Sequence, residues 1–178
     1  MKPPAGFQNS PEAFRAQLVE GHYNELRVAL FYMLAGCHVR IGFDGARYDI
    51  TLVSPKGRRR VEVKWDKRAA GTGRLYFEVE NTRQRAPSGI MATTADIWCH
   101  VLGEGERALI VPVPALREFL AGGGFQSVHT GGQDSNSRGL LVPVKAIPVG
   151  KPFHRARLPS VEEYFGELYR RAFSATSR

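Results

Sequence analysis

Cysteines and long apolar segments are both scarce in this sequence, and their scarcity disfavours several classes of protein. The two cysteines, Cys37 and Cys99, lie in apolar stretches, so we expect buried, reduced thiols rather than a disulfide. Neither they nor the five histidines have the spacing of zinc ligands. The longest apolar run, residues 28–34, is too short to cross a bilayer, and no apolar core of a signal peptide follows Met1. We therefore expect a cytoplasmic protein with neither zinc nor a membrane partner.

Two common catalytic motifs are also missing. The sequence has no G-x-S-x-G element, and its histidines have no nucleophile at a recognisable spacing, which disfavours a serine hydrolase. It also has no G-x-x-x-x-G-K-[ST] element, which disfavours an ATP-driven motor.

Acidic residues are the minority charge in this chain. Its 25 Lys and Arg residues exceed its 17 Asp and Glu residues, giving a net charge of +8. A protein this basic is attracted to polyanions, of which nucleic acid is the most abundant in a cell. The hydrophobic fraction of 43% is that of a folded protein, and 178 residues fit one domain. Composition therefore favours a single globular domain that binds DNA or RNA.

Hydrophobic periodicity and turn residues predict an α/β fold. A long helix begins at Ser10, could break at Gly21 and stops near Gly36. A terminal helix follows an N-cap at Ser160. The other predicted elements are strands at 37–43, 47–53, 59–65, 74–80, 96–102, 108–113 and 139–147, a helix at 114–120 and a loop at 81–94. We expect one domain over 1–178: a loose leader (1–9), a core (10–120), a flexible Gly-rich loop (121–138) and a C-terminal strand and helix (139–178).

Asp49, Glu62 and Lys64 are the candidate catalytic residues. Glu62 and Lys64 are two residues apart on a predicted strand and so project from the same face, and Asp49 lies on the preceding strand. Two adjacent carboxylates repel unless a cation lies between them, and such hard oxygen ligands suit Mg²⁺ or Mn²⁺. Lys64 adds a positive charge that can orient a water molecule or stabilise a pentavalent phosphate. The alternative is an ordinary solvated strand face with cross-strand ion pairs.

These residues also carry a family resemblance. Tyr48-Asp49, followed after twelve residues by Glu62-Val63-Lys64, resembles the PD-(D/E)XK nuclease superfamily, although many members have Pro at the position of Tyr48. Residues 21–25 are similar to the family's first helix, and residues 73–78, 88–90 and 93–98 are similar to phage-type members. The resemblance covers about residues 20–115. It implies a restriction-endonuclease-like core, with a central mixed β-sheet of four strands flanked by helices, and Mg²⁺-dependent phosphodiester hydrolysis.

The resemblance also implies roles for individual residues. Asp49 and Glu62 would be metal ligands together with the carbonyl of Val63, and Lys64 would activate or position the attacking water. The first helix would supply a further ligand, for which we favour Glu25 over Glu20. For Glu25, the role of an ordinary exposed helix residue stays open. Two more acidic residues on the next strand carry less weight, namely Glu78 and Glu80.

Basic and hydroxyl side chains surround this predicted site. Phosphate contacts supply most of the non-specific affinity for DNA, so basic residues clustered here favour a DNA track, although each one alone reads as a solvated charge. We predict DNA contacts from Arg58, Arg59, Arg60, Lys67, Arg68, Arg74, Arg83, Arg85, Ser88, Thr93 and Thr94. For Asp96 we favour a structural, hydrogen-bonding role.

The sequence therefore favours a structure-selective DNA endonuclease, of the type that resolves branched DNA for a phage or mobile element. If a phage encodes it, the cytoplasm is that of the host. An exonuclease, a sequence-specific restriction or homing enzyme, and a non-catalytic DNA-binding module with a nuclease fold are the alternatives. A resolvase would be a homodimer, because four-way junctions have two-fold symmetry. The terminal helix offers an apolar stripe for this contact, or for packing on its own sheet: Tyr164, Phe165, Leu168, Tyr169 and Phe173.

Overall fold

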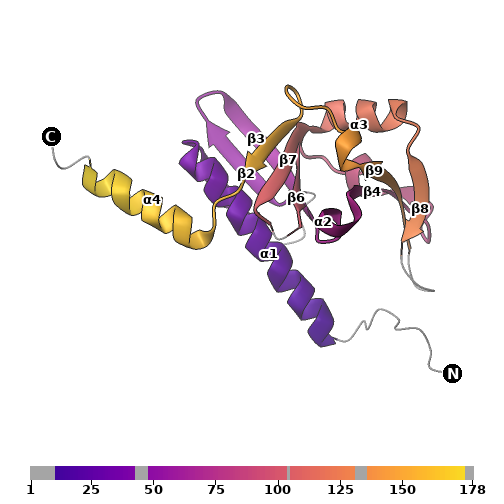
Figure 1. The fold of residues 1–178 in the computed structure, drawn as a ribbon, viewed down its shortest axis with the longest axis horizontal. Helices are drawn as coiled ribbons and strands as arrows, with labels where there is room; N and C mark the ends of the chain where they lie inside the picture. The colour runs from indigo at the N-terminus through magenta and orange to yellow at the C-terminus, as the bar shows by residue number, and fades with distance from the viewer. Residues whose placement is uncertain (1–10, 43–47, 104, 131–135, 175–178) are drawn as a thin grey trace.

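A six-stranded mixed sheet forms the centre of the protein in a computed structural model, which describes residues 11–42, 48–103, 105–130 and 136–174 (Figure 1). In spatial order its strands are β1 (His38–Ile41), β2 (Ile50–Ser54), β3 (Gly57–Asp66), β6 (Ile97–Leu102), β7 (Arg107–Pro112) and β10 (His154–Arg157). Strands β3 and β6 pair in parallel, and every other neighbouring pair is antiparallel. The predicted α/β fold with a central mixed sheet is confirmed.

A second, antiparallel sheet lies beside the first. Its strands, in spatial order, are β5 (Ala86–Pro87), β4 (Arg74–Asn81), β9 (Ser137–Pro143) and β8 (Gln126–Thr130). The two sheets enclose a core that includes Leu75 and Phe77 of β4 and Trp98 of β6. The resemblance implied a single four-stranded sheet, so the second sheet is an addition that the sequence did not predict.

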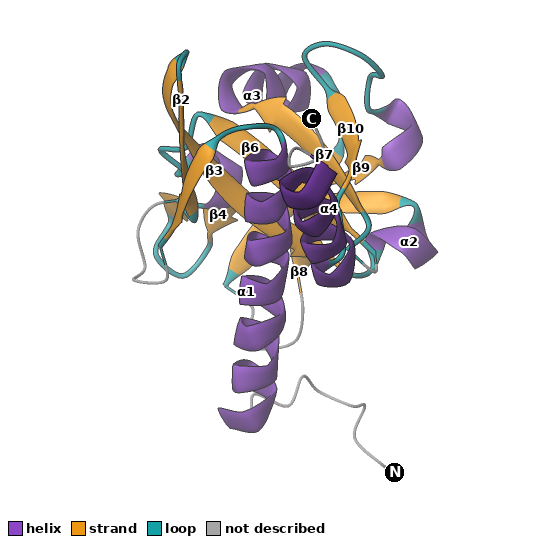
Figure 2. Ribbon diagram, turned by 90° about the vertical axis from the view of Figure 1, so that its left-hand side faces the viewer, coloured by secondary structure: helices purple, strands orange, loops and turns teal. Residues whose placement is uncertain are grey.

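The helices of the described ranges are α1 (Pro11–Leu34), α2 (Ala69–Thr72), α3 (Val113–Gly122) and α4 (Val161–Ser174), with 3₁₀ turns η1 (Gly89–Met91) and η2 (Val144–Ala146). Helices α1 and α3 flank the main sheet, whereas α2 contacts β4 and α4 contacts α1 (Figure 2). Helix α1 packs on strands β1, β2 and β3, and α3 contacts β6, β7 and η1. None of the helices in the described ranges is long and apolar enough to cross a membrane.

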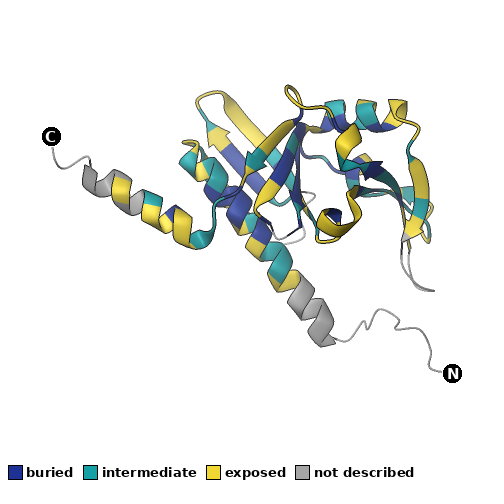
Figure 3. Ribbon diagram, in the orientation of Figure 1, coloured by how far each residue is buried: buried dark blue, intermediate teal, exposed yellow. Residues whose placement is uncertain are grey.

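The alternation of side chains along β3 divides the protein into two cores. Val61 and Val63 are buried on the face covered by α1, together with Val28. Glu62 and Lys64 point to the opposite face, as expected for alternate residues of a strand. Figure 3 shows the buried residues in the middle of α1, on the strands and in part of α3, whereas the β2–β3 hairpin tip is exposed. The charged face of β3 therefore lies on the side of the sheet opposite the core that α1 covers.

Several predicted elements differ from those observed. Helix α1 continues through Gly21, because one glycine costs only about 1 kcal/mol and the packing of α1 on the sheet offsets it. The predicted loop 121–138 contains strand β8, and the predicted loop 81–94 contains β5 and η1. Strand β10 lies where the sequence predicted no element, and the strand predicted to reach residue 147 ends at Pro143.

Other predictions are confirmed or lie outside the described residues. Gly36 ends α1 with a φ of 85°, a left-handed conformation that favours glycine. Cys99 is buried and Cys37 half-buried, and both are free thiols. The leader predicted over residues 1–9 lies outside the described part of the chain.

Candidate active site

Asp49 lies beside Glu62 because of the register of the β2–β3 hairpin. Ile50 pairs with Val61, and the backbone N–H of Asp49 donates to the Val61 carbonyl over 3.0 Å. Asp49 is therefore one position before the paired segment, next to Glu62. Its carboxylate oxygen Oδ2 accepts a hydrogen bond of 2.7 Å from the N–H of Val63. The hairpin thus brings the two predicted carboxylates together and fixes one of them to the backbone of the strand that carries the other.

Both carboxylate oxygens of Glu62 have partners. Its Oε1 lies 2.6 Å from the ammonium nitrogen of Lys64, and its Oε2 accepts a hydrogen bond of 3.2 Å from the hydroxyl of Thr93. The Glu62 side chain is 12% exposed and that of Lys64 is 46% exposed. Glu62 is therefore the more buried of the two residues, and neighbouring side chains hold both of its oxygens.

Burial is the main influence on the pKa of Asp49. Together with the negative charges of Glu62 and Glu25, and against the lowering effects of the Val63 N–H and of Lys64, burial raises the pKa of this carboxyl group to about 6. Burial alone would lower the pKa of Lys64. The negative charges of Glu62, Asp49 and Glu78 outweigh this effect and hold the pKa above its usual value. Lys64 is therefore a cation at neutral pH, surrounded by carboxylates that repel one another.

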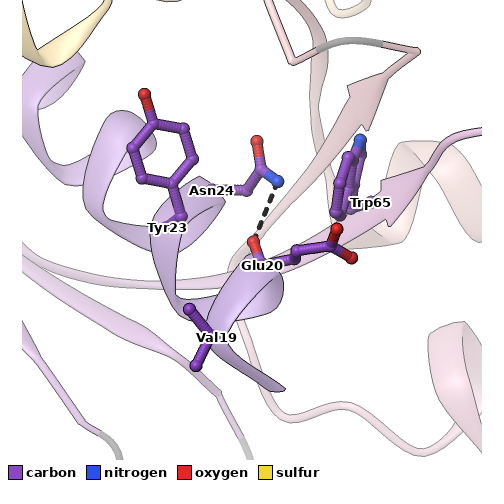
Figure 4. Close-up of a pocket in the computed structure, with 5 residues that line it drawn as sticks. All are labelled: Val19, Glu20, Tyr23, Asn24 and Trp65. Carbon is purple, nitrogen blue, oxygen red and sulfur yellow. Dashed lines mark hydrogen bonds between the residues drawn. The ribbon is translucent and has the colours of Figure 1, made fainter. Parts of the chain in front are cut away.

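The two candidate helix ligands lie in different surroundings. The negative charge of Glu25 helps to raise the pKa of Asp49, and the Glu25 carboxylate lies 3.1 Å from Nδ1 of His22. Glu20 instead forms an ion pair with Lys67. Figure 4 shows Glu20 lining a pocket on the α1 side of β3, with Val19, Tyr23, Asn24 and Trp65. This arrangement favours Glu25 over Glu20 as the helix residue of the site.

The chemistry of the site fits a hard divalent cation. Mg²⁺ is commonly bound through one or two carboxylates, with water and substrate phosphates completing its six ligands. Asp49 and Glu62 supply two such carboxylates, and a cation would offset both the burial and the carboxylate repulsion that raise the pKa of Asp49. Within the described ranges, no three His, Cys, Asp or Glu side chains form a metal-binding group.

The carbonyl of Val63 is directed toward the same strand edge as the Asp49 carboxylate. The N–H of Val63 donates to Asp49 across this edge, and the N–H and C=O of one strand residue point to the same side. The position is therefore compatible with the predicted role of this carbonyl as a ligand, and that role remains a prediction.

The basic residues of β3 divide between its two faces. Arg58 and Arg60 share the face of Glu62, whereas Arg59 lies on the α1 face with Val61. Arg58 and Arg59 are exposed. Arg60 is bound to Asp96, 3.3 Å from its carboxylate, and its guanidinium lies 5.7 Å from the ring centre of Tyr48. Arg60 therefore ties β3 to the start of β6, which agrees with the structural role predicted for Asp96.

The other predicted DNA contacts are spread over several elements. Lys67 lies over the ring of Trp65, on the side of the sheet away from Glu62. Four arginines are exposed in the turns and strands after β3, namely Arg68, Arg74, Arg83 and Arg85. Of the hydroxyl residues, Thr94 is half-buried and the Ser88 oxygen is buried, whereas Thr93 is 9% exposed and donates to Glu62.

Two features of the site were not predicted from the sequence. The Val63 N–H bond to Asp49 depends on hairpin register, and the Thr93 bond to Glu62 joins residues 31 positions apart. The negative charge of Glu78, to which we gave little weight, helps to raise the pKa of Lys64. Glu80 instead forms an ion pair with Arg138 of β9. The sequence signals for this segment were the hydroxyl residues Ser88, Thr93 and Thr94 and the resemblance at 88–90 and 93–98, and neither identified the bond to Glu62.

Comparisons with known proteins give a weak likeness among solved structures. No protein-family model and no curated protein matches the sequence. Among solved structures, a bacterial homing endonuclease, I-Ssp6803I, is similar with a TM-score of 0.46 and 18% identity, covering 90% of this chain and 97% of that chain. A likeness of this degree assigns no function, so the function must be argued from the site itself.

Proposed function

We propose that this protein is a Mg²⁺-dependent DNA endonuclease. The observation that carries the proposal is the convergence of Asp49, Glu62 and Lys64 at one point of the main sheet, with the pKa of Asp49 raised by burial and by neighbouring carboxylates. Shifts of this kind concentrate at functional sites, because a solvated strand face would not place two carboxylates and a lysine in partial burial.

Each residue of the site has a distinct task in this proposal. Asp49, Glu62 and the Val63 carbonyl would hold Mg²⁺, or Mn²⁺ in its place, with Glu25 as a further ligand directly or through water. The bound cation would lower the pKa of a water molecule and neutralise charge on the phosphate. The carboxylates of Glu62, Asp49 and Glu78 raise the pKa of Lys64, so its ammonium group can donate hydrogen bonds. It would position the attacking water or stabilise the phosphate in the transition state.

The substrate class follows from the charge of the surrounding surface. The chain carries a net charge of +8, and exposed Arg58 lies on the same face of β3 as Glu62. DNA phosphates drawn to this face would pass over the carboxylate site. Within this class we propose a structure-selective enzyme for branched DNA, of phage or mobile-element origin and acting in the cytoplasm, rather than an exonuclease or a restriction or homing enzyme.

The proposal is tested with linear, flap and four-way DNA substrates, incubated with and without Mg²⁺. We expect cleavage only with the cation, and preferentially at the branched substrates. Asp49→Ala should abolish cleavage and Mn²⁺ binding, measured by calorimetry. It should leave DNA binding intact or tighter, because it removes a negative charge near the phosphates. Unchanged cleavage by Asp49→Ala, or cleavage in EDTA, would contradict the mechanism.

A further inference from the structure

The segment between β5 and β6, residues 88–93, connects the proposed site to helix α3. It ends at Thr93, whose hydroxyl accepts a hydrogen bond of 3.1 Å from the N–H of Ala95. The hydroxyl has a single proton, and this proton is directed to Glu62 Oε2 at 3.2 Å. Thr93 is therefore oriented by its own backbone to act as a donor toward the Glu62 carboxylate.

Arg117 of α3 holds this segment from the other side. Its guanidinium donates to three backbone carbonyls: 2.9 Å to Ile90, 3.3 Å to Met91 and 2.9 Å to Thr93. These charge-assisted bonds are stronger than bonds between neutral groups, and they converge on one short segment. A long, flexible side chain is thereby used to fix the backbone that carries the Thr93 hydroxyl.

The same segment packs closely against strand β4. Gly89 has a φ of 50°, and a Cβ atom at this position would lie 2.5 Å from the carbonyl oxygen of Glu78. The N–H of Thr93 closes the turn by donating to the Gly89 carbonyl over 3.0 Å, and Ile90 is fully buried. The position of Thr93 is therefore set by close packing as well as by hydrogen bonds.

We propose that Thr93 is a positioning residue for Glu62, and that Arg117 anchors it through residues 88–93. This inference rests on the proposed function, in which Glu62 is a ligand of the cation. Glutamate has three rotatable side-chain bonds, and fixing them before the cation arrives removes an entropic cost from binding. The assignment replaces the phosphate contact that the sequence suggested for Thr93, because its buried hydroxyl is already directed to Glu62.

Two substitutions at Thr93 separate positioning from packing. Thr93→Val keeps the shape but removes the hydroxyl, whereas Thr93→Ser keeps the hydroxyl. We expect Thr93→Val to weaken Mn²⁺ binding by about 10–100-fold, the range typical of lost outer-shell partners, as measured by calorimetry on the full chain. Thr93→Ser should bind Mn²⁺ within a few fold of the unmodified protein. DNA affinity in EDTA should be the same for both.

Arg117→Lys tests the anchor. Lysine keeps the charge but cannot donate to three carbonyls in one plane, so we expect weaker Mn²⁺ binding in the same direction as Thr93→Val. Because both changes act on one connection, the double variant should be little weaker than Thr93→Val alone. The matched control is Arg155→Lys, since Arg155 also donates to a backbone carbonyl, that of Val144, and should leave Mn²⁺ binding unchanged.

The outcomes distinguish this inference from the proposed function. If Glu62→Gln abolishes Mn²⁺ binding while Thr93→Val leaves it unchanged, Glu62 is a ligand but Thr93 does not position it, and the inference is overturned. If Thr93→Val lowers DNA affinity in EDTA and not Mn²⁺ affinity, Thr93 is a phosphate contact and the inference is again overturned. If Glu62→Gln leaves Mn²⁺ binding intact, the metal role of Glu62 in the proposed function fails.

Discussion

Asp49 shows how a residue identified from sequence acquires its properties only in the fold. Its spacing from Glu62 and Lys64 identified it as a candidate ligand. Its pKa could not be predicted in this way, because the pKa depends on burial and on Glu25, which approaches from a different element. The hydrogen bond from the Val63 N–H, which opposes the shift, likewise depends on hairpin register. Sequence patterns thus identify the chemical groups, whereas tertiary packing determines their charge state.

The raised pKa of Asp49 predicts a pH-dependent stability. Its folded-state value, about 6, lies above the usual 3.8, so the fold favours the protonated carboxyl group. The protonated carboxyl group stabilises the fold. This stabilisation is complete below about pH 4 and is lost as the pH rises through 6. In EDTA, Asp49→Asn should therefore be more stable than the unmodified protein at pH 7.5. We expect about 1–2 kcal/mol in urea unfolding, with a smaller gain at pH 5.

Asp96 provides the control for this measurement. The side-chain hydrogen bond from Arg60 lowers the pKa of Asp96, so this group stabilises the fold above its ordinary pKa and loses that effect only as the pH falls through the lowered value. Asp96→Asn should therefore cost the same stability at pH 5 and at pH 7.5. A gain from Asp49→Asn that does not change between these pH values would contradict the assigned pKa.

At the scale of elements, strand β3 could be predicted and the second sheet could not. The alternation of Arg60, Val61, Glu62, Val63 and Lys64 fixed both the strand and its charged face, and the structure confirms the strand. Strand β8 was missed because glycines flank it on both sides, and β10 was missed because it has only four residues and pairs with a strand far back in the sequence. Strand β8 pairs with β9, and β10 pairs with β7. Each segment therefore has the local sequence pattern of a loop.

The two faces of β3 predict different effects for adjacent arginines. Arg58 lies on the face of Glu62 and Arg59 on the face of α1, and both are exposed. Arg58→Ala should weaken binding to all DNA sequences alike and reduce the log–log salt slope by roughly one unit, as expected for one lost phosphate contact. Arg59→Ala is the matched control and should change neither value, which revises the DNA contact that the sequence suggested for Arg59, because this residue lies on the opposite face from Glu62. Fluorescence anisotropy at several salt concentrations measures both, and equal effects would place the DNA elsewhere.

At the scale of the whole molecule, helix α4 extends away from the two sheets (Figure 1). Near its start, Tyr164 is buried, and its hydroxyl lies 3.7 Å from the Met33 sulfur of α1. The next residue, Phe165, is 61% exposed. The sequence continues the apolar stripe at Leu168, Tyr169 and Phe173. A helix with a pronounced apolar stripe normally buries it, and in a basic protein this stripe is a surface on which two copies can meet.

We therefore predict a homodimer formed through α4. An enzyme that cuts two opposed strands of a four-way junction needs two sites related by two-fold symmetry, and this chain has one proposed site. Light scattering should give twice the mass of the chain, and Phe165→Asp should give the monomer without loss of fold, because this side chain is exposed within one copy. Val149→Asp, which alters an 81% exposed residue outside α4, should leave the dimer intact. A monomer both free and on junction DNA would contradict junction resolution and favour a nuclease that makes single cuts.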